Sequence, residues 1–265
     1  MGPCRVLLWG YRQIFLTPER IDAGAQFWRD NRQALEEIAQ RTGVPVEMLV
    51  GIIGVETYYG RITGSYRVLD ALATLAFYYP DTGNDRSDFF SRELMQFIAL
   101  GDEESLPLRD VEGSYAGAMG LGQFMPSSYR EYAVDLDGDG RRDLWDSLAD
   151  VIGSVANYLH RHGWEYGQPV TSRAQVAEGA DMDRVSRRNL KPEATVAELG
   201  AAGFTPVDGQ PGNLPAAVTR LREEDGDSYW LTYRNFYVIT RYNRSPLYAM
   251  AVHDLAQAIA AEYGE

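Results

Sequence analysis

One carboxylate lies within an otherwise apolar stretch of the chain. Glu56 follows Leu49, Ile52 and Ile53 at helical spacing, so these side chains share one face of a helix predicted to begin near Pro45. An ionised carboxylate among Leu and Ile side chains is unfavourable, and we therefore expect burial to raise the pKa of Glu56. A carboxyl group that stays protonated nearer neutral pH suits general acid catalysis, which makes Glu56 the candidate catalytic residue.

A second candidate site is an acidic loop. Residues 135–146 (Asp-Leu-Asp-Gly-Asp-Gly-Arg-Arg-Asp-Leu-Trp-Asp) match the twelve-residue calcium loop of EF-hand proteins, with Asp at position 12 in place of the usual Glu. The alternative is a solvated acidic turn, but five carboxylates in twelve residues repel one another without a cation. We therefore predict a structural Ca²⁺ site, with no cofactor for catalysis. Its expected ligands are Asp135, Asp137, Asp139, the backbone carbonyl of Arg141, Asp143 (directly or through water) and Asp146.

A third segment, residues 114–129, is rich in glycine. Gly117, Gly120 and Gly122 precede Gln123, and glycines allow the backbone to approach a ligand or another element closely. The spacing fits neither the phosphate-binding loop nor the dinucleotide fingerprint, so a nucleotide role is not expected. A tight loop that packs helices together is the alternative, and the segment alone leaves both open.

Other chemistries find little support in the sequence. His160, His162 and His253 lack the spacing of metal ligands, and no Gly-x-Ser-x-Gly motif accompanies them. Cys4 is the one cysteine, which excludes an internal disulfide, and its place near the N-terminus disfavours a nucleophilic role.

The elements that must position these residues are mostly helices. Apolar side chains at helical spacing predict helices over residues 18–40, from 45 through Glu56, over 70–77 and 87–100, from 147 to 161, and from 245 onward. Between residues 163 and 233, Gly, Pro and charged residues separate short apolar pieces, which predict strands at 216–219 and 228–232 and a brief helix at 195–202. The fold class expected is α+β, predominantly α-helical.

Composition narrows the classes of function. A net charge of −13 over 265 residues argues against binding to nucleic acid or to anionic lipid through a basic face. The 17 Tyr and 5 Trp suit carbohydrate binding, although most are expected in the core. No apolar run reaches the length of a membrane span, and the start of the chain lacks an intact secretion signal.

The motifs together resemble the lytic murein transglycosylase B family, in the same order from about Tyr11 to near the end. Residues 80–88 and 171–228 do not match clearly. The matching segments are 54–57 (Gly-Val-Glu-Thr) with 59–60 (Tyr-Gly), 69–75 (Leu-Asp-Ala-Leu-Ala-Thr-Leu), 117–120 (Gly-Ala-Met-Gly), 122–129 (Gly-Gln-Phe-Met-Pro-Ser-Ser-Tyr), 153–158 (Gly-Ser-Val-Ala-Asn-Tyr), 163–164 (Gly-Trp), 235–237 (Asn-Phe-Tyr) and 239–243 (Ile-Thr-Arg-Tyr-Asn).

The resemblance implies a lysozyme-like core with an additional helical lobe and a small β lobe. The core would comprise residues 45–71, 109–162 and 233–265, including the EF-hand-like loop 135–146. The helical lobe would comprise 1–44 and about 72–108, and the β-containing lobe 163–232.

The resemblance also implies the reaction, cleavage of the β-1,4 bond between N-acetylmuramic acid and N-acetylglucosamine in peptidoglycan. The muramyl 6-hydroxyl attacks C1 of its own sugar and leaves a 1,6-anhydro end, while Glu56 acts first as acid and then as base. Because the substrate supplies the nucleophile, a second carboxylate is dispensable. The substrate-binding residues implied are Ser114, Met119, Gln123, Phe124, Tyr158, Tyr242, Asn243, Tyr248, Tyr11 and, where the family tends to have a pair of arginines, Arg86 alone.

A monomer that acts on glycan strands in the periplasm follows from this resemblance. Its export leader would precede the present sequence, with lipid anchoring to the outer membrane and other cell-wall enzymes as partners left open. Two rival functions also remain: a hydrolytic muramidase on the same core, and a catalytically silent wall-binding module.

Overall fold

The computed structural model describes residues 8–81, 83–186 and 189–264, and these form two compact units. One unit comprises residues up to Ala25, Gly43–Gly51 and the chain from Leu159; the other comprises Gln26–Thr42 and Ile52–Tyr158. Cys4 lies outside the described residues. Of the described helices, none alone has the length and hydropathy of a membrane span, and one bent pair passes that test by composition and length only.

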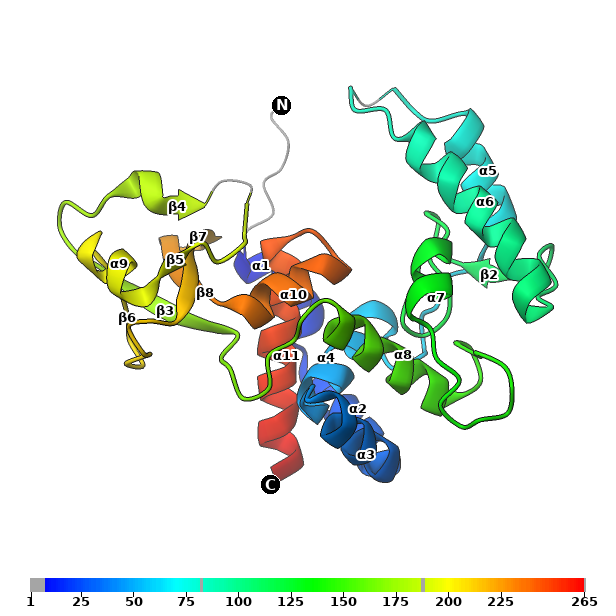
Figure 1. The fold of residues 1–265 in the computed structure, drawn as a ribbon, viewed down its shortest axis with the longest axis horizontal. Coiled ribbons are helices and arrows are strands. Elements are labelled where there is room, and N and C mark those ends of the chain that lie inside the picture. Colours follow the sequence, from blue (N-terminus) through cyan, green and yellow to red (C-terminus); the bar gives the residue numbers. More distant parts are fainter. Residues whose placement is uncertain (1–7, 82, 187–188, 265) are drawn as a thin grey trace. The chain divides into compact units, whose positions relative to one another are not determined.

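The unit that contains Glu56 is helical. Its main elements are α3 (Arg32–Thr42), the end of α4 (Val46–Thr57), α5 (Val68–Phe77), α6 (Ser87–Glu104), α7 (Pro126–Tyr132) and most of α8 (Leu148–Arg161). Figure 1 shows α5 and α6 side by side, with α7 against α6. A two-stranded antiparallel ladder, β1 (Tyr66–Arg67) with β2 (Glu112–Gly113), joins the start of α5 to the glycine-rich segment.

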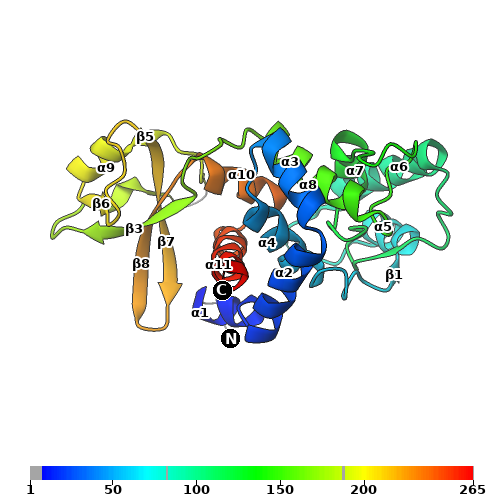
Figure 2. The same cartoon turned by 90° about the horizontal axis from the view of Figure 1, so that it is seen from below.

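The other unit combines helices with a six-stranded sheet. Its strands run in the order β4 (Val185–Ser186), β7 (Pro215–Glu223), β8 (Gly226–Thr232), β3 (Thr171–Val176) and β6 (Phe204–Pro206), and β5 (Ala194–Thr195) pairs with β7. The β7–β8 hairpin is the long pair in Figure 2. Between the strands lie a 3₁₀ turn η1 (Met182–Arg184) and α9 (Val196–Ala201), which begins with a capping box between Thr195 and Glu198.

The sheet has its own small core. Buried side chains from α9 and the strands pack together, including Val196, Leu199, Phe204, Val218 and Leu231. The predicted strands at 216–219 and 228–232 and the brief helix near 195–202 are thereby confirmed.

Three further helices lie within this second unit: α1 (Leu8–Phe15), α10 (Arg234–Tyr242) and α11 (Pro246–Gly264). Arg12 of α1 pairs with Asp254 of α11 at 2.6 Å and with Glu223 of β7 at 3.5 Å. The first turns of α4 pack on α11 at Gly51, where an added Cβ would lie 3.0 Å from Ala256 Cβ.

The prediction of one helix over residues 18–40 is wrong. The chain forms α2 (Pro18–Asp30) and then α3, with a break at Asn31. The side-chain Nδ2 of Asn31 donates to the carbonyl of Phe27 at 2.9 Å. The Asn31 backbone N–H donates to the same carbonyl at 3.2 Å, so the side chain shares an acceptor with the helix backbone. Apolar spacing alone does not reveal this.

Candidate functional site

Glu56 lies in the last turn of α4, at the edge of a fully buried stripe. Leu49, Ile52 and Ile53 are 0% exposed, whereas Glu56 itself is half-buried. The apolar face therefore continues to the carboxylate but does not enclose it. Glu56 has a polar or electrostatic contact within the structure. Whether its pKa is raised stays a prediction.

The backbone turns sharply directly after Glu56. Tyr58 and Tyr59 have φ of 53° and 58°, a left-handed conformation that non-glycine residues rarely adopt, and Gly60 follows at 87°. The Tyr59 ring lies over Gly54, where an added Cβ would approach its hydroxyl to 2.7 Å. Strained backbone of this kind persists where the surrounding structure holds it, and it is common at functional sites.

Two hydrogen bonds join this turn to the glycine-rich segment. The buried Thr57 hydroxyl donates to the carbonyl of Leu121 at 2.9 Å. The Gln123 side chain donates to the carbonyl of Thr63 at 3.0 Å and to that of Gly120 at 2.9 Å. The chain on both sides of the turn is therefore held against residues 120–123.

The glycine-rich segment owes its shape to close backbone approaches. The backbone N–H groups of Met119 and Phe124 each donate to the other's carbonyl at 2.9 Å, closing a tight loop. An added Cβ at Gly120 would lie 2.4 Å from the carbonyl oxygen of Leu144. The glycines of this loop thus meet other parts of the chain, which is the packing role that the sequence left open beside ligand binding.

Ser114 and Gln123 each retain one hydrogen-bonding function. The Ser114 hydroxyl oxygen accepts from the backbone N–H groups of Ala116 and Ala118, at 3.3 and 3.0 Å, so its own hydrogen can still be donated. Both N–H bonds of Gln123 go to carbonyls, which leaves its side-chain oxygen as an acceptor. Both side chains are half-buried.

Three other substrate-binding residues predicted in this unit, one Met and two aromatic residues, are buried. Met119 and Phe124 are 0% and 2% exposed. The Tyr158 ring is 7% exposed and lies 5.8 Å from Phe124 and 4.8 Å from Tyr132. Met119 and Phe124 are thus the buried part of the glycine-rich loop, and Tyr158 of α8 packs against Phe124.

Arg86 lies on the exposed start of α6. Its guanidinium is 4.6 Å from the Phe89 ring and 5.3 Å from that of Phe90, on the same helix.

Four predicted substrate-binding residues belong to the other compact unit. Tyr11 is half-buried in α1, Tyr242 is half-buried at the end of α10, Asn243 is exposed beside it, and Tyr248 is 2% exposed in α11. The Tyr11 ring packs against Phe15, with centroids 5.2 Å apart. That these four residues meet the same substrate as Glu56 stays a prediction.

The acidic loop gathers three carboxylates, one of them outside the twelve-residue window. Oxygens of Asp135, Asp137 and Asp150 lie within 4.8 Å of one another, and Asp150 is fully buried in the first turn of α8. Burial raises the pKa of Asp150, and the Asp137 charge adds to the effect, against hydrogen bonds from the backbone N–H groups of Leu136 and Asp143. Such a group of oxygen donors fits Ca²⁺.

The remaining predicted ligands lie apart from this group. Asp139 accepts the backbone N–H of Arg141 at 2.8 Å, and Asp143 accepts those of Trp145 and Asp146 at 2.9 and 3.0 Å. Asp146 and the Arg141 side chain are exposed. Sequence reasoning missed Asp150, although an acidic residue in the first helical turn after the loop was an available signal.

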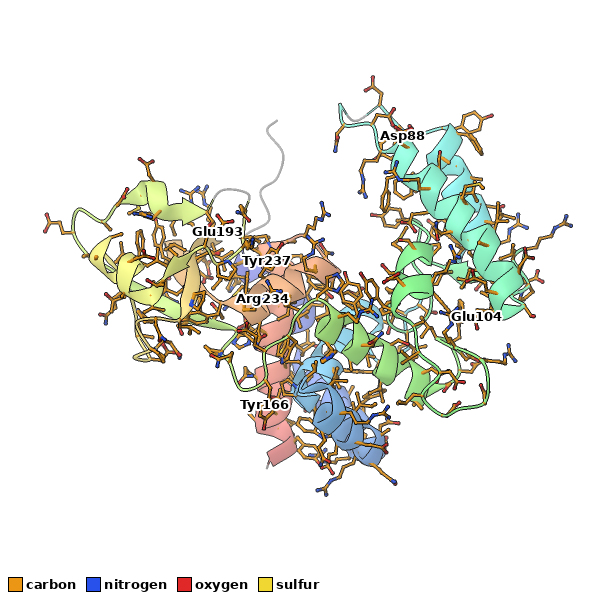
Figure 3. The ribbon with its side chains drawn as sticks, in the orientation of Figure 1. Asp88, Glu104, Tyr166, Glu193, Arg234 and Tyr237 are labelled. Carbon is orange, nitrogen blue, oxygen red and sulfur yellow. The ribbon has the colours of Figure 1, made fainter. Side chains whose placement is uncertain are left out.

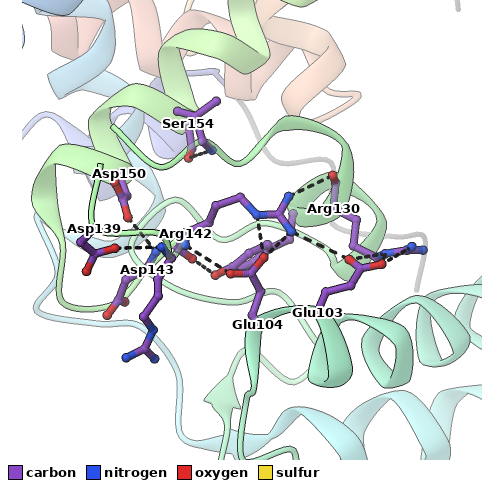
Figure 4. A network of polar contacts seen from close by, with 11 residues as sticks. Glu103, Glu104, Arg130, Asp139, Arg142, Asp143, Asp150 and Ser154 are labelled. Carbon is purple, nitrogen blue, oxygen red and sulfur yellow. Dashed lines mark hydrogen bonds and ion pairs between the residues drawn. The ribbon is translucent and has the colours of Figure 1, made fainter. Parts of the chain in front are cut away.

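An ion-pair network anchors the acidic loop to α6 and α7 (Figure 4). Arg142 pairs with Glu104 and Arg130 pairs with Glu103. The backbone N–H of Arg142 also donates to Glu104 at 3.2 Å. A cavity of about 450 Å³ beside this network is lined by Thr63, Glu104 and the loop, but not by Glu56, Ser114 or Gln123.

Comparisons with known proteins agree on the family of this chain. The Transglycosylase SLT domain family matches residues 5–257. Membrane-bound lytic murein transglycosylase B of Escherichia coli K12 is 48% identical over 252 residues, which are 94% of this chain and 66% of that protein. The chain therefore spans about two thirds of the length of that relative.

Solved structures agree in fold. Soluble lytic transglycosylase SltB1 from Pseudomonas aeruginosa superposes with a TM-score of 0.90 at 45% identity, covering 98% of this chain and 85% of that one. Lytic transglycosylase Slt35 of E. coli, solved in complex with calcium, gives 0.86 at 45% identity, covering 97% and 80%. The predicted α+β, lysozyme-like fold class and the resemblance are confirmed, while the division into three lobes stays a prediction. The chain belongs to the Transglycosylase SLT domain family, in its lytic murein transglycosylase branch.

Proposed function

We propose that this chain cleaves the β-1,4 bond between N-acetylmuramic acid and N-acetylglucosamine in peptidoglycan without adding water. The observation that carries the proposal is the attachment of the Glu56 turn, through Thr57 and Gln123, to the glycine-rich loop. This attachment connects a half-buried carboxylic acid with a segment that offers a donor at Ser114 and an acceptor at Gln123.

The proposed mechanism uses one carboxyl group twice. Protonated Glu56 donates its proton to the glycosidic oxygen as the C1–O4 bond breaks, so the departing sugar leaves with a free hydroxyl. The carboxylate then takes the proton from the muramyl 6-hydroxyl as its oxygen bonds to C1. Glu56 ends protonated as it began, and the product carries a 1,6-anhydro ring.

The side chains around Glu56 would orient the sugar. Ser114 can donate to, and Gln123 accept from, polar groups of the reacting residue. Met119, Phe124 and Tyr158 support the loop that carries them. Tyr11, Tyr242, Asn243, Tyr248 and Arg86 are proposed to contact more distant parts of the strand.

We also propose a structural Ca²⁺ site in the acidic loop. Asp135 and Asp137 would hold the ion with Asp150, whose carboxylate lies within 4.8 Å of theirs in place of the position-12 Asp146. Asp139 and the Arg141 carbonyl are the next candidates, and Asp143 could bind through water. When bound, the ion would neutralise charges that otherwise repel and would brace the loop between α7 and α8.

Location and partners follow from the substrate. Peptidoglycan lies outside the cytoplasmic membrane, so the proposed site of action is the periplasm, with glycan strands as the partner. Lipid anchoring to the outer membrane is supported only by the words "membrane-bound" in the name of the E. coli relative. A monomer is proposed, and a role for other cell-wall enzymes stays open.

Mass spectrometry of the products from purified peptidoglycan tests the reaction. Anhydro ends, lighter by one water than reducing muramic acid ends, are the expected result. Hydrated products would identify a hydrolytic muramidase instead, and intact peptidoglycan would leave a wall-binding module as the function.

A further inference from the structure

The loop between α8 and β3 carries two aromatic side chains that the proposed reaction does not use. Tyr166 is 83% exposed, whereas Trp164, two residues earlier, is 8% exposed. Figure 3 marks Tyr166 on this loop. A cavity of about 490 Å³ within the same compact unit is lined by these two rings together with Pro45, Glu47, Gln168 and Gln210.

Side chains from α10 hold this loop in one shape. Arg234 donates to the carbonyls of His162 and Gly163, at 2.9 and 3.2 Å. The buried Asn235 accepts from the backbone N–H of Glu165 at 2.8 Å and donates to the carbonyls of Glu165 and Gln168, at 2.8 and 2.9 Å. Tyr166 is thus an exposed aromatic ring on a preorganised loop, which reduces the entropy lost when a ligand binds.

Two of the lining residues, Trp164 and Gln210, carry hydrogen-bonding groups that no described residue uses. Trp164 Nε1 is buried and has no hydrogen-bond partner among the described residues. A buried donor without a partner is unfavourable, and native proteins rarely keep one. Gln210 donates to Asp208 at 3.0 Å, which leaves its side-chain oxygen as an acceptor.

The lining chemistry favours a neutral sugar over an acidic peptide. A flat aromatic face beside amide donors and acceptors suits a sugar ring with its hydroxyl and acetamide groups. Among the residues that the structure describes, no Lys, Arg or His lines the cavity, and the Glu47 carboxylate would repel the carboxylates of an acidic peptide.

We propose that this cavity is a second carbohydrate site, which binds an N-acetylhexosamine unit of a glycan strand through Tyr166 and Trp164. The site shares no residue with the Glu56 site. The choice of a glycan rests on the proposed function, because a second binding site increases the avidity of an enzyme for an insoluble polymer.

The test is titration of the Glu56→Gln variant with the tetramer of N-acetylglucosamine, followed through the tryptophan indole N–H signals by NMR. We expect the Trp164 signal to shift as the site fills. Tyr166→Ala should weaken this binding about three- to tenfold, whereas Tyr166→Phe should retain it because the ring remains. Tyr78→Ala, which removes a ring that is 81% exposed in the other unit, is the matched control and should change nothing.

Trp164→Phe assigns the signal; if that variant does not fold, Phe substitutions of Trp9, Trp28, Trp145 and Trp230 assign it by elimination. An unshifted Trp164 signal at millimolar tetramer would overturn the proposal, as would an equal effect of Tyr78→Ala. A shift caused by an acidic muropeptide stem but not by the tetramer would instead identify a peptide site. The products of the unaltered chain separate this inference from the proposed function. If one of these contrary results occurs while the unaltered chain still forms anhydro products, the second site is wrong and the proposed reaction stands.

Discussion

At the scale of single residues, Glu56 places a half-buried carboxylate at the end of a buried helix face. Three apolar residues of its face are wholly buried, yet the carboxylate itself reaches a half-buried position in the last turn of α4. That position lets an acid meet a sugar while its helix stays in the core. The left-handed residues Tyr58 and Tyr59 turn the chain sharply immediately afterwards.

Glu56→Gln should reduce glycan cleavage by at least roughly 10²–10⁴-fold, because the amide can neither donate the required proton nor accept one. Release of soluble muropeptides from purified peptidoglycan measures the loss, and circular dichroism with a melting curve checks that the fold is retained. Cleavage at the unaltered rate by a folded variant would remove Glu56 from the mechanism.

His253 makes a residue-scale prediction about pH. Burial lowers its pKa, its Nδ1 atom has no hydrogen-bond partner among the described residues, and nearby Arg12 opposes protonation while Asp254 favours it. The unfolded chain binds a proton near pH 6.5, and the folded chain does so only at lower pH. Stability is therefore fully present above about pH 6.5 and falls as the pH drops toward the lowered value.

The predicted loss approaches about 1.4 kcal/mol per pH unit within that window. Melting temperatures between pH 7.5 and 5.5 should fall less steeply for His253→Asn than for the unaltered chain. His160→Asn replaces an exposed histidine of α8 and should preserve the slope. Identical slopes for all three proteins would contradict a neutral buried His253.

At the scale of elements, the attachment of α4 to the glycine-rich loop depends on Thr57. Thr57→Val keeps the shape of the side chain but leaves the Leu121 carbonyl without its partner, which should lower stability by about 1–3 kcal/mol. Activity should fall beyond the loss of folded protein, because the loop that carries Ser114 and Gln123 loses one of its two hydrogen bonds to the chain around the Glu56 turn.

Thr74→Val on the exposed face of α5 is the matched control for Thr57→Val. Chemical denaturation and the rate of muropeptide release, corrected for the folded fraction, separate the two effects. A Thr57→Val protein with full specific activity would show that this attachment does not position the site.

The acidic loop makes a second element-scale prediction, which distinguishes two ligand sets. Calcium should raise the melting temperature of the unaltered chain. At a calcium concentration one hundred times the dissociation constant, the free energy of unfolding should increase by about 2.7 kcal/mol. Asp150→Asn should remove most of this gain, because its carboxylate lies with those of Asp135 and Asp137. Asp146→Asn should leave most of it, because Asp146 is exposed and lies outside the group.

Melting curves with calcium and with chelator provide the measurement for both variants. The reverse ranking of the two variants would favour the twelve-residue calcium loop. No response of the unaltered chain to chelator, at low ambient calcium, would show that the loop does not depend on the ion.

At the scale of the whole molecule, the net charge of −13 should influence stability. Like charges repel in the compact state, and added salt screens them. Raising NaCl from low to physiological concentration, at constant calcium, should therefore raise the melting temperature. A fall would mean that attractive pairs such as Arg142–Glu104 and Arg12–Asp254 outweigh the general repulsion.

Much of the fold could be predicted because it depends on local patterns. Pro45 precedes α4, apolar spacing marks α5, α6 and α11, and short apolar pieces between Gly, Pro and charged residues mark β7 and β8. The break at Asn31 was not predicted because the apolar spacing runs through it, whereas the Asn31 side chain shares the Phe27 carbonyl with its own backbone N–H.

The sequence by itself determined the family, the catalytic candidate and the presence of an acidic loop, because each lies in a contiguous motif whose residue types carry the chemistry. Only the tertiary structure showed that Asp150 joins Asp135 and Asp137, that Thr57 and Gln123 bind the Glu56 turn to the glycine-rich loop, and that α10 holds the loop that carries Tyr166. These contacts join residues that are distant in the chain or lie in different elements. Spacing along one segment reports which residues share a face, whereas the partner of a hydrogen bond is chosen when the elements pack.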